Sequence, residues 1–288
     1  MAKTIITADL HFGIHEQYDE IVESFLQNLQ SLGEIDSFVI IGDVAESLEL
    51  DSRHFGNNHK KLFKLIQQLP VENIAFCAGN HDIWTNRGLD SWEILTERLK
   101  ALADDSGVTY LEANNLYTEE AAIVGTMGHY DYSLATKGLE INGIKVNDDH
   151  YETKTPPGYE TPLWNDALYI HWSYGDKGAC EKICSAFDKR LDEAMKKRDR
   201  IIVATHTVPM LEMNGHQYKE KPMSNFLNAF SGTARLGEII LSHANKGKAI
   251  KAFSGHTHLA AGPILINDVE FHNIGSDYGT PKFIVLER

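Results

Sequence analysis

The stretch TIITADLHFG at residues 4–13 places a strand-like apolar run directly before two side chains that can bind metal, Asp9 and His11. Three more stretches have the same form: FVIIGDVAE at 38–46, NIAFCAGNHD at 73–82 and IKAFSGHTH at 250–258. A fifth, IIVATHT at 201–207, carries a single histidine. Because strand ends in an open α/β sheet share one edge, ligands far apart in sequence converge there. The sequence therefore predicts a metal site assembled from across the fold.

The order of apolar runs predicts an α/β fold with helices outside two sheets. Strands are expected at 3–8, 37–41, 73–77, 121–125, 200–204 and 249–254. Helical patterns occur at 17–32, 57–69, 88–104, 176–198 and 233–244. This alternation calls for right-handed crossovers and a mostly parallel sheet. Short strands separated by turns predict an antiparallel extension at 262–266, 269–273 and 282–287.

Residues 130–166 interrupt this rhythm with irregular apolar spacing and a Pro-Pro-Gly turn. Long loops in a compact domain often serve as lids or binding loops. We therefore expect one domain over 1–288 with a loop or cap insertion at about 128–175. Its aromatic side chains could line a substrate pocket or merely anchor the loop; they are Tyr130, Tyr132, Tyr151, Tyr159, Trp164 and Trp172. Among the remaining histidines, His129 is expected nearest the pocket.

Composition restricts the location and the partners. No apolar run is long enough to cross a membrane, and the MAKTIITADLH start lacks the features of a signal peptide, so we expect a cytoplasmic protein. A formal net charge of −14 disfavours long nucleic acid as a partner, because binding to a phosphate backbone requires a basic surface. A small phosphorylated substrate could still enter a cleft that holds divalent cations. The oligomeric state is left open.

The candidate ligands are chemically mixed. GNHD at 79–82 offers the Asn80 amide and the His81 imidazole, while GHTH offers His256 and His258. Any one of these motifs is weak evidence, but together and in this order they indicate a metal site. Oxygen and imidazole ligands in mixture suit Mn²⁺, Fe²⁺ or Zn²⁺. A carboxylate such as Asp43 can bridge two divalent ions about 3.5–4 Å apart.

The five blocks resemble, in order, the pattern DxH, GDxx(D), GNH(D/E), H and GHxH of the calcineurin-like metallophosphoesterase superfamily. The resemblance implies a four-layer α/β/β/α sandwich of two mixed sheets flanked by helices. It also implies a first metal held by Asp9, His11 and His258, a second held by Asn80, His206 and His256, and Asp43 bridging both. His81 would then face the leaving group.

A phosphoesterase mechanism follows from this resemblance. Two cations lower the pKa of a shared water toward neutrality, which supplies a hydroxide nucleophile, and His81 could donate a proton to the leaving alkoxide. We expect hydrolysis of a small phosphomonoester or phosphodiester. A nucleotide pyrophosphatase or nuclease using the same site is the alternative. A non-catalytic scaffold is less favoured, because the chain keeps every ligand and the histidine.

Two positions depart from well-known branches of the superfamily. Glu46, three residues after Asp43, could orient His81 or could be a solvated loop residue. GDVAES lacks the GDxxDRG motif of protein serine/threonine phosphatases, and purple acid phosphatases have a tyrosine where Glu46 stands, so the sequence fits neither branch. Ser47 stands where GDxxDRG has an arginine that binds phosphate, so another cation could be needed to bind the substrate. Candidates by proximity are Arg53, His54 and Arg87.

Overall fold

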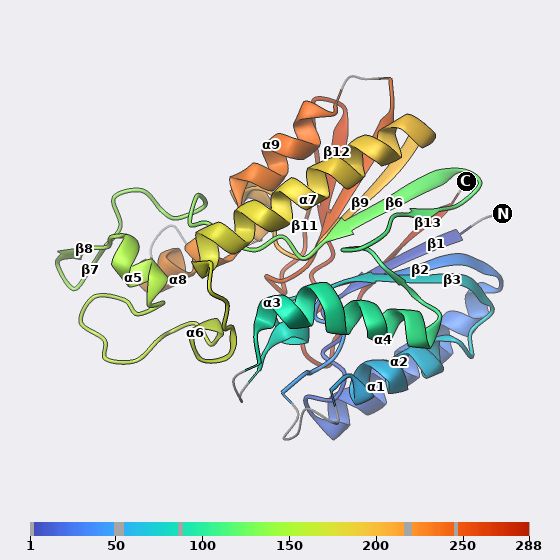
Figure 1. Cartoon of the computed structure of the whole chain (residues 1–288), viewed down its shortest axis with the longest axis horizontal. Coiled ribbons are helices and arrows are strands. Elements are labelled where there is room, and N and C mark those ends of the chain that lie inside the picture. Colours follow the sequence, from blue (N-terminus) through green and yellow to red (C-terminus); the bar gives the residue numbers. More distant parts are fainter. Residues whose placement is uncertain (1–2, 49–54, 86–88, 216–220, 245–246, 288) are drawn as a thin grey trace.

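The computed structural model describes residues 3–48, 55–85, 89–215, 221–244 and 247–287. One sheet has the strand order β13-β1-β2-β3-β4 (Figure 1). Its strands are β1 (Lys3–Ala8), β2 (Ile35–Ile41), β3 (Val71–Cys77), β4 (Thr109–Tyr110) and β13 (Phe283–Glu287). β1 to β4 run parallel, while β13 pairs antiparallel with β1.

The other large sheet has the order β11-β12-β10-β9-β6-β5. Its strands are β5 (Leu116–Tyr117), β6 (Ala121–Thr126), β9 (Arg200–Thr205), β10 (Ala249–Ser254), β11 (Ala261–Ile266) and β12 (Val269–Asn273). β6, β9, β10 and β12 are parallel, and β5 and β11 are antiparallel edges. The predicted antiparallel tail is therefore divided: β11 and β12 extend this sheet, whereas β13 crosses to the other.

Helices cover the outer face of each sheet (Figure 1). Over the first lie α1 (Glu16–Leu29), α2 (Asn57–Ile66), α3 (Ser91–Glu93) and α4 (Leu99–Ser106), with a π-helical turn at Ile94–Arg98 joining the last two. Over the second lie α7 (Gly175–Lys197) and α9 (Ala234–Ser242). α1 shows why these segments are helical: Val22, Leu26 and Leu29 are buried at helical spacing, and His15 caps its first turn.

Strand side chains explain the stacking of the layers. On β1, Ile5 packs outward under the helices, and Ile6 packs inward with Val39, Ile202 and Phe253 of both sheets. Since successive strand residues point to opposite faces, a strand apolar on both faces requires cover on both sides. The predicted four-layer α/β/β/α sandwich of two mixed sheets is thus confirmed.

The segment 128–175 lies at one end of the molecule (Figure 1). It forms a small hairpin, β7 (Glu140–Ile141) with β8 (Ile144–Lys145), and two short helices, α5 (Asp148–Glu152) and α6 (Asp166–Tyr169). An aromatic cluster packs it against α8 (Pro222–Leu227) and the 3₁₀ turn η6 (Asn228–Phe230). That this segment is an insertion into a single domain stays a prediction. Among the described helices, none is both long and apolar enough to cross a membrane.

Candidate metal centre

The loops after β1, β2 and β10 turn sharply as they leave the sheets. Five of the predicted ligands have left-handed backbone: Asp9 (φ 52°), His11 (φ 45°), Asp43 (φ 45°), His256 (φ 69°) and His258 (φ 58°). This conformation is costly for residues with a Cβ and is concentrated at functional sites. Here it lets each loop return its side chain across the strand ends.

Together with the loops after β3 and β9, which carry Asn80 and His206, these loops bring all seven predicted ligands together in two groups. Asp9, His11, Asp43 and His258 each offer a ligand atom within 4.8 Å of the others, and Asp43, His206 and His256 form a second such group. Asn80 joins the second group, since its Oδ1 lies 3.0 Å from His206 Nε2. Asp43 is common to both groups, which is the arrangement expected of a bridging carboxylate.

The second group fits a cation by the direction of its lone pairs. His206 Nδ1 lies 3.2 Å from the Ile41 carbonyl oxygen, and His256 Nε2 lies 3.0 Å from that of Phe230. A ring nitrogen beside a carbonyl must carry the proton, so the other nitrogen of each ring keeps a lone pair. Those two nitrogens, His206 Nε2 and His256 Nδ1, are only 3.1 Å apart. Two facing lone pairs at this distance suit a cation bound between them.

The first group shows the same pattern. His258 Nδ1 lies 2.9 Å from an oxygen of Asp277, which leaves Nε2 directed at His11 Nε2, 3.2 Å away. Asp9 Oδ1 accepts the His256 amide N–H at 2.8 Å, while its Oδ2 is buried without a hydrogen-bond partner among the described residues. An orphaned carboxylate oxygen beside inward-facing imidazoles suits a bound cation.

The electrostatics of the site also suit a cation. Burial raises the pKa of the Asp9 and Asp43 carboxyls well above the ordinary value. Burial lowers the pKa of His206 to about 3 and holds the pKa values of His11 and His256 well below 6.5. Burial by itself thus favours the uncharged form of all five groups. Bound divalent ions would favour ionised carboxylates and neutral rings, the forms in which these side chains act as ligands.

His81 and Glu46 form a pair at the edge of this centre. Glu46 Oε2 lies 3.1 Å from His81 Nδ1, and the two side chains are 13% and 9% exposed. Glu46 is therefore not a solvated loop residue. Ser47 is also buried; its hydroxyl contacts the carbonyl oxygens of His81 and Trp84 at 2.7 and 2.8 Å. It supports the 81–84 turn, so this position cannot bind phosphate.

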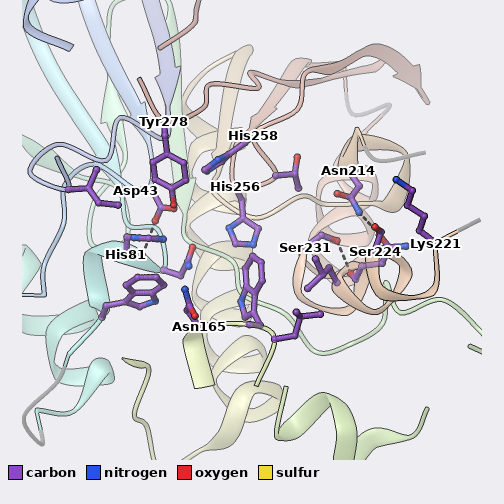
Figure 2. A pocket seen from close by; sticks show the side chains of 18 residues that line it. Asp43, His81, Asn165, Asn214, Lys221, Ser224, Ser231, His256, His258 and Tyr278 are labelled. Atoms are coloured by element: carbon purple, nitrogen blue, oxygen red, sulfur yellow. Dashed lines mark hydrogen bonds between the residues drawn. The ribbon is translucent and has the colours of Figure 1, made fainter. Parts of the chain in front are cut away.

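A cavity of about 680 Å³ opens over the metal centre (Figure 2). Asp43, His81, His256 and His258 lie toward one end, and Asn214, Lys221, Ser224 and Ser231 lie at the other (Figure 2). Trp84, Trp164 and Tyr278 complete its walls near the ligands. The phenol of Tyr278 points down toward Asp43 and His81 (Figure 2).

The aromatic residues of the 128–175 segment divide between the two roles considered from sequence. Trp164 lines the cavity. Tyr130, Tyr132 and Tyr151 are buried anchors in the aromatic cluster. Neither Tyr159, which is 49% exposed, nor Trp172 lines the cavity.

His129, the histidine expected nearest the pocket, does not line the cavity. It is fully buried and pairs with Asp176 at 3.0 Å. The cations suggested near the motifs, Arg53, His54 and Arg87, lie outside the described residues.

Several residues at the site were not found from sequence. Asp82 accepts hydrogen bonds from the amides of Val44, Ala45 and Gly79, and from His59, which locks the loops after β2 and β3 together. Asp82 is the last residue of the GNHD motif, and this position in the motif could have identified it as a residue of the site. Tyr278 and Asp277 come from a turn with no motif, and their ring and carboxylate contact His258. Only the fold places them here.

Comparison with known proteins agrees with this geometry. The family model described as calcineurin-like phosphoesterase matches residues 2–260. The chain therefore belongs to the calcineurin-like phosphoesterases, and it is a metal-dependent phosphoric ester hydrolase. The scaffold alternative is set aside. The family uses two divalent metal ions, and the two ligand groups sharing Asp43 are the candidates to hold them.

Two solved structures show a similar fold. A phosphopantetheinyl hydrolase from Mycobacterium tuberculosis has a TM-score of 0.67 at 18% identity, covering 98% of this chain and 95% of that one. A dimetal phosphatase from Danio rerio has a TM-score of 0.53 at 12% identity, covering 98% and 91%. No curated protein matches the chain.

Proposed function

We propose that this protein hydrolyses small organic phosphomonoesters or phosphodiesters with two metal ions. The ions would be held by Asp9, His11 and His258 on one side, by Asn80, His206 and His256 on the other, and by Asp43 between them. The observation that carries the proposal is the single buried Asp43 carboxylate shared by two sets of converging lone pairs. Mixed oxygen and nitrogen donors favour Mn²⁺, Fe²⁺ or Zn²⁺ over Ca²⁺.

The two bound ions would supply a water that ionises near neutral pH and would neutralise phosphoryl charge. The chain's own residues complete the chemistry. His81, with Nδ1 held by Glu46, presents Nε2 to the cavity and donates a proton to the leaving oxygen. Glu46 stabilises the protonated ring. Burial and the charge of Asp43 raise the pKa of the Tyr278 phenol, so its hydroxyl stays protonated and donates to a phosphoryl oxygen.

The cavity supports a substrate larger than phosphate alone. A volume of about 680 Å³ falls within the range of small-molecule pockets, roughly 300–1,000 Å³. Its far end carries amide and hydroxyl side chains and one lysine, Lys221, which suits a polar organic group. Segment 128–175, which we interpret as an insertion into one domain over 1–288, supplies Trp164 to this cavity.

The test is hydrolysis by purified protein loaded with Mn²⁺, Fe²⁺ or Zn²⁺. The panel comprises an aryl phosphate, a bis-aryl phosphate, nucleoside mono- and diphosphates, single-stranded DNA and a phosphopantetheinyl ester, the last because one similar structure is named for it. We expect small esters to be hydrolysed, and Asp43→Asn to lose nearly all activity and metal. Activity confined to DNA or to the pyrophosphate bond would replace this proposal with the nuclease or pyrophosphatase alternative. Full activity in Asp43→Asn would refute the bridging role.

A further inference from the structure

Asp166 is the point where segment 128–175 meets the metal centre. Its carboxylate is buried, with the residue 1% exposed, and it accepts four hydrogen bonds. The donors to Oδ1 are Asn80 Nδ2 at 3.0 Å and Trp84 Nε1 at 2.7 Å. The donors to Oδ2 are the Tyr130 hydroxyl and Trp164 Nε1, both at 2.9 Å. Each oxygen thus receives two donors from different parts of the chain.

The contact with Asn80 decides which end of that amide faces the metal position. A carboxylate oxygen only accepts, so Asp166 holds Nδ2 and leaves Oδ1 directed at His206 Nε2, 3.0 Å away. The reversed amide would set its oxygen against the carboxylate and turn an N–H₂ group toward the cation. Asp166 therefore presents Asn80 in its ligating orientation.

The two indoles held by Asp166 are walls of the cavity. Trp84 stacks on His81 with ring centroids 3.6 Å apart, beside the proposed proton donor. Trp164 lies edge-on to His256 at 5.6 Å, beside the second ligand group. Because both indole N–H groups point at one carboxylate, neither wall can rotate without breaking its bond to Asp166.

We propose that Asp166 is a positioning residue that orients Asn80 toward the second metal and fixes Trp84 and Trp164 as walls for the substrate. The inference deepens the proposed function and rests on it. The part that concerns the two tryptophan walls, the substrate half, depends on the proposed substrates; the part that concerns metal binding, the metal half, depends only on Asn80 as a ligand. Alanine at 166 removes all four acceptor contacts. Asparagine would be a weaker test, because it could keep its oxygen toward Asn80 and Trp84 and donate its amide N–H to the Tyr130 hydroxyl, which can accept.

Metal titration of Asp166→Ala by calorimetry tests the metal half without any substrate. We expect the second Mn²⁺ to bind about 10–100-fold more weakly and the first to bind as in the wild type, the usual effect of losing a partner that orients a ligand. Asp176→Ala is the matched control: Asp176 is a buried carboxylate with donors from His129, Tyr132 and Lys154, and it contacts no proposed ligand. Unchanged binding of both ions in Asp166→Ala, or equal weakening in the control, would overturn the inference.

A double-mutant cycle separates orientation from general damage. If Asp166 acts through Asn80, adding Asp166→Ala to Asn80→Ala should not weaken metal binding further. A second loss of the same size would contradict the mechanism. Neither titration needs turnover, so a panel in which no ester is hydrolysed would refute the proposed substrates and leave this result in force.

The walls are tested by a variant that leaves the Asn80 contact intact. Trp164→Phe removes one donor and part of the wall. We expect KM for the best organic ester to rise about 10-fold, the effect of roughly 1.4 kcal/mol, with kcat and metal stoichiometry unchanged. An unaltered KM would overturn the wall assignment, and this variant keeps the test of the walls available should Asp166→Ala fail to fold in a circular-dichroism melt.

Discussion

Glu46 and His81 stand at the ends of different strands, yet Glu46 Oε2 lies 3.1 Å from His81 Nδ1. His81 is also held by the Trp84 ring on one face and by its own backbone N–H, which donates to Asp43 Oδ1 at 2.9 Å. The imidazole is therefore held by two neighbours, and its backbone by a third, before any substrate arrives. Such preorganisation lets a proton donor act without reorganising its surroundings.

Glu46→Gln keeps the shape of the side chain and removes its charge. We expect kcat to fall about 10-fold with metal content unchanged, whereas His81→Asn should cost about 100-fold or more, within the range for general acid catalysis. The double variant should be no slower than His81→Asn. If adding Glu46→Gln slowed the His81→Asn variant further, Glu46 would have a role independent of His81.

Tyr278→Phe removes a hydroxyl that points into the cavity. A hydrogen bond to a charged group contributes about 1.5–3 kcal/mol, so kcat/KM should fall roughly 10–100-fold. Inorganic phosphate should inhibit the variant more weakly. Tyr18→Phe is the control, since Tyr18 stacks on Tyr278 with centroids 6.3 Å apart but does not line the cavity. Equal effects in both variants would mean that ring packing, rather than the hydroxyl, is responsible.

Gly79 lies directly against the shared carboxylate. A Cβ added there would lie 2.2 Å from both Asp43 N and Asp43 Oδ1. Gly79→Ala must therefore displace Asp43; we expect a loss of about 1–3 kcal/mol in the free energy of unfolding and loss of bound metal. Gly178→Ala in α7 is the comparison, where the nearest atom would be 3.1 Å away. Metal analysis showing two ions per chain in Gly79→Ala would contradict the predicted displacement.

Asp176 should make stability depend on acid pH. Burial by itself raises its pKa, but the hydrogen bond from His129 and the charge of Lys154 outweigh burial and hold the pKa well below 3.8. A carboxyl whose pKa is depressed in the folded state contributes stability above its unfolded pKa and loses it as pH falls toward the folded value. Asp176→Asn should therefore lower the free energy of unfolding by roughly 3 kcal/mol at pH 7.

Urea denaturation at several pH values measures this effect. The difference between wild type and Asp176→Asn should be constant from pH 7 down to about pH 5 and should shrink below about pH 4. A difference that grew as the pH fell would show that the carboxyl is not stabilised by its cationic and hydrogen-bonding partners.

The sequence by itself determined the fold class and the family, and it proposed the ligand set. Apolar runs that end in Asp9, Asp43, Asn80, His206 and His256 specify strands, and parallel strand ends must share an edge. The order of the motifs then identified the family. The fold and the convergence of these side chains were predictable because each depends on a short local pattern and on one rule of sheet geometry.

Only the tertiary structure decided what surrounds the ligands. Asp166 lies 86 positions from Asn80 along the chain, and the Ile41 carbonyl that orients His206 lies 165 positions away. Tyr278 reaches the cavity from a turn before β13. No local pattern encodes such contacts, because hydrogen bonds between distant segments depend on how loops pack after the sheets have formed. The same physics explains why His129 does not line the cavity: its ring is buried against Asp176 of α7, which lies 47 positions away along the chain.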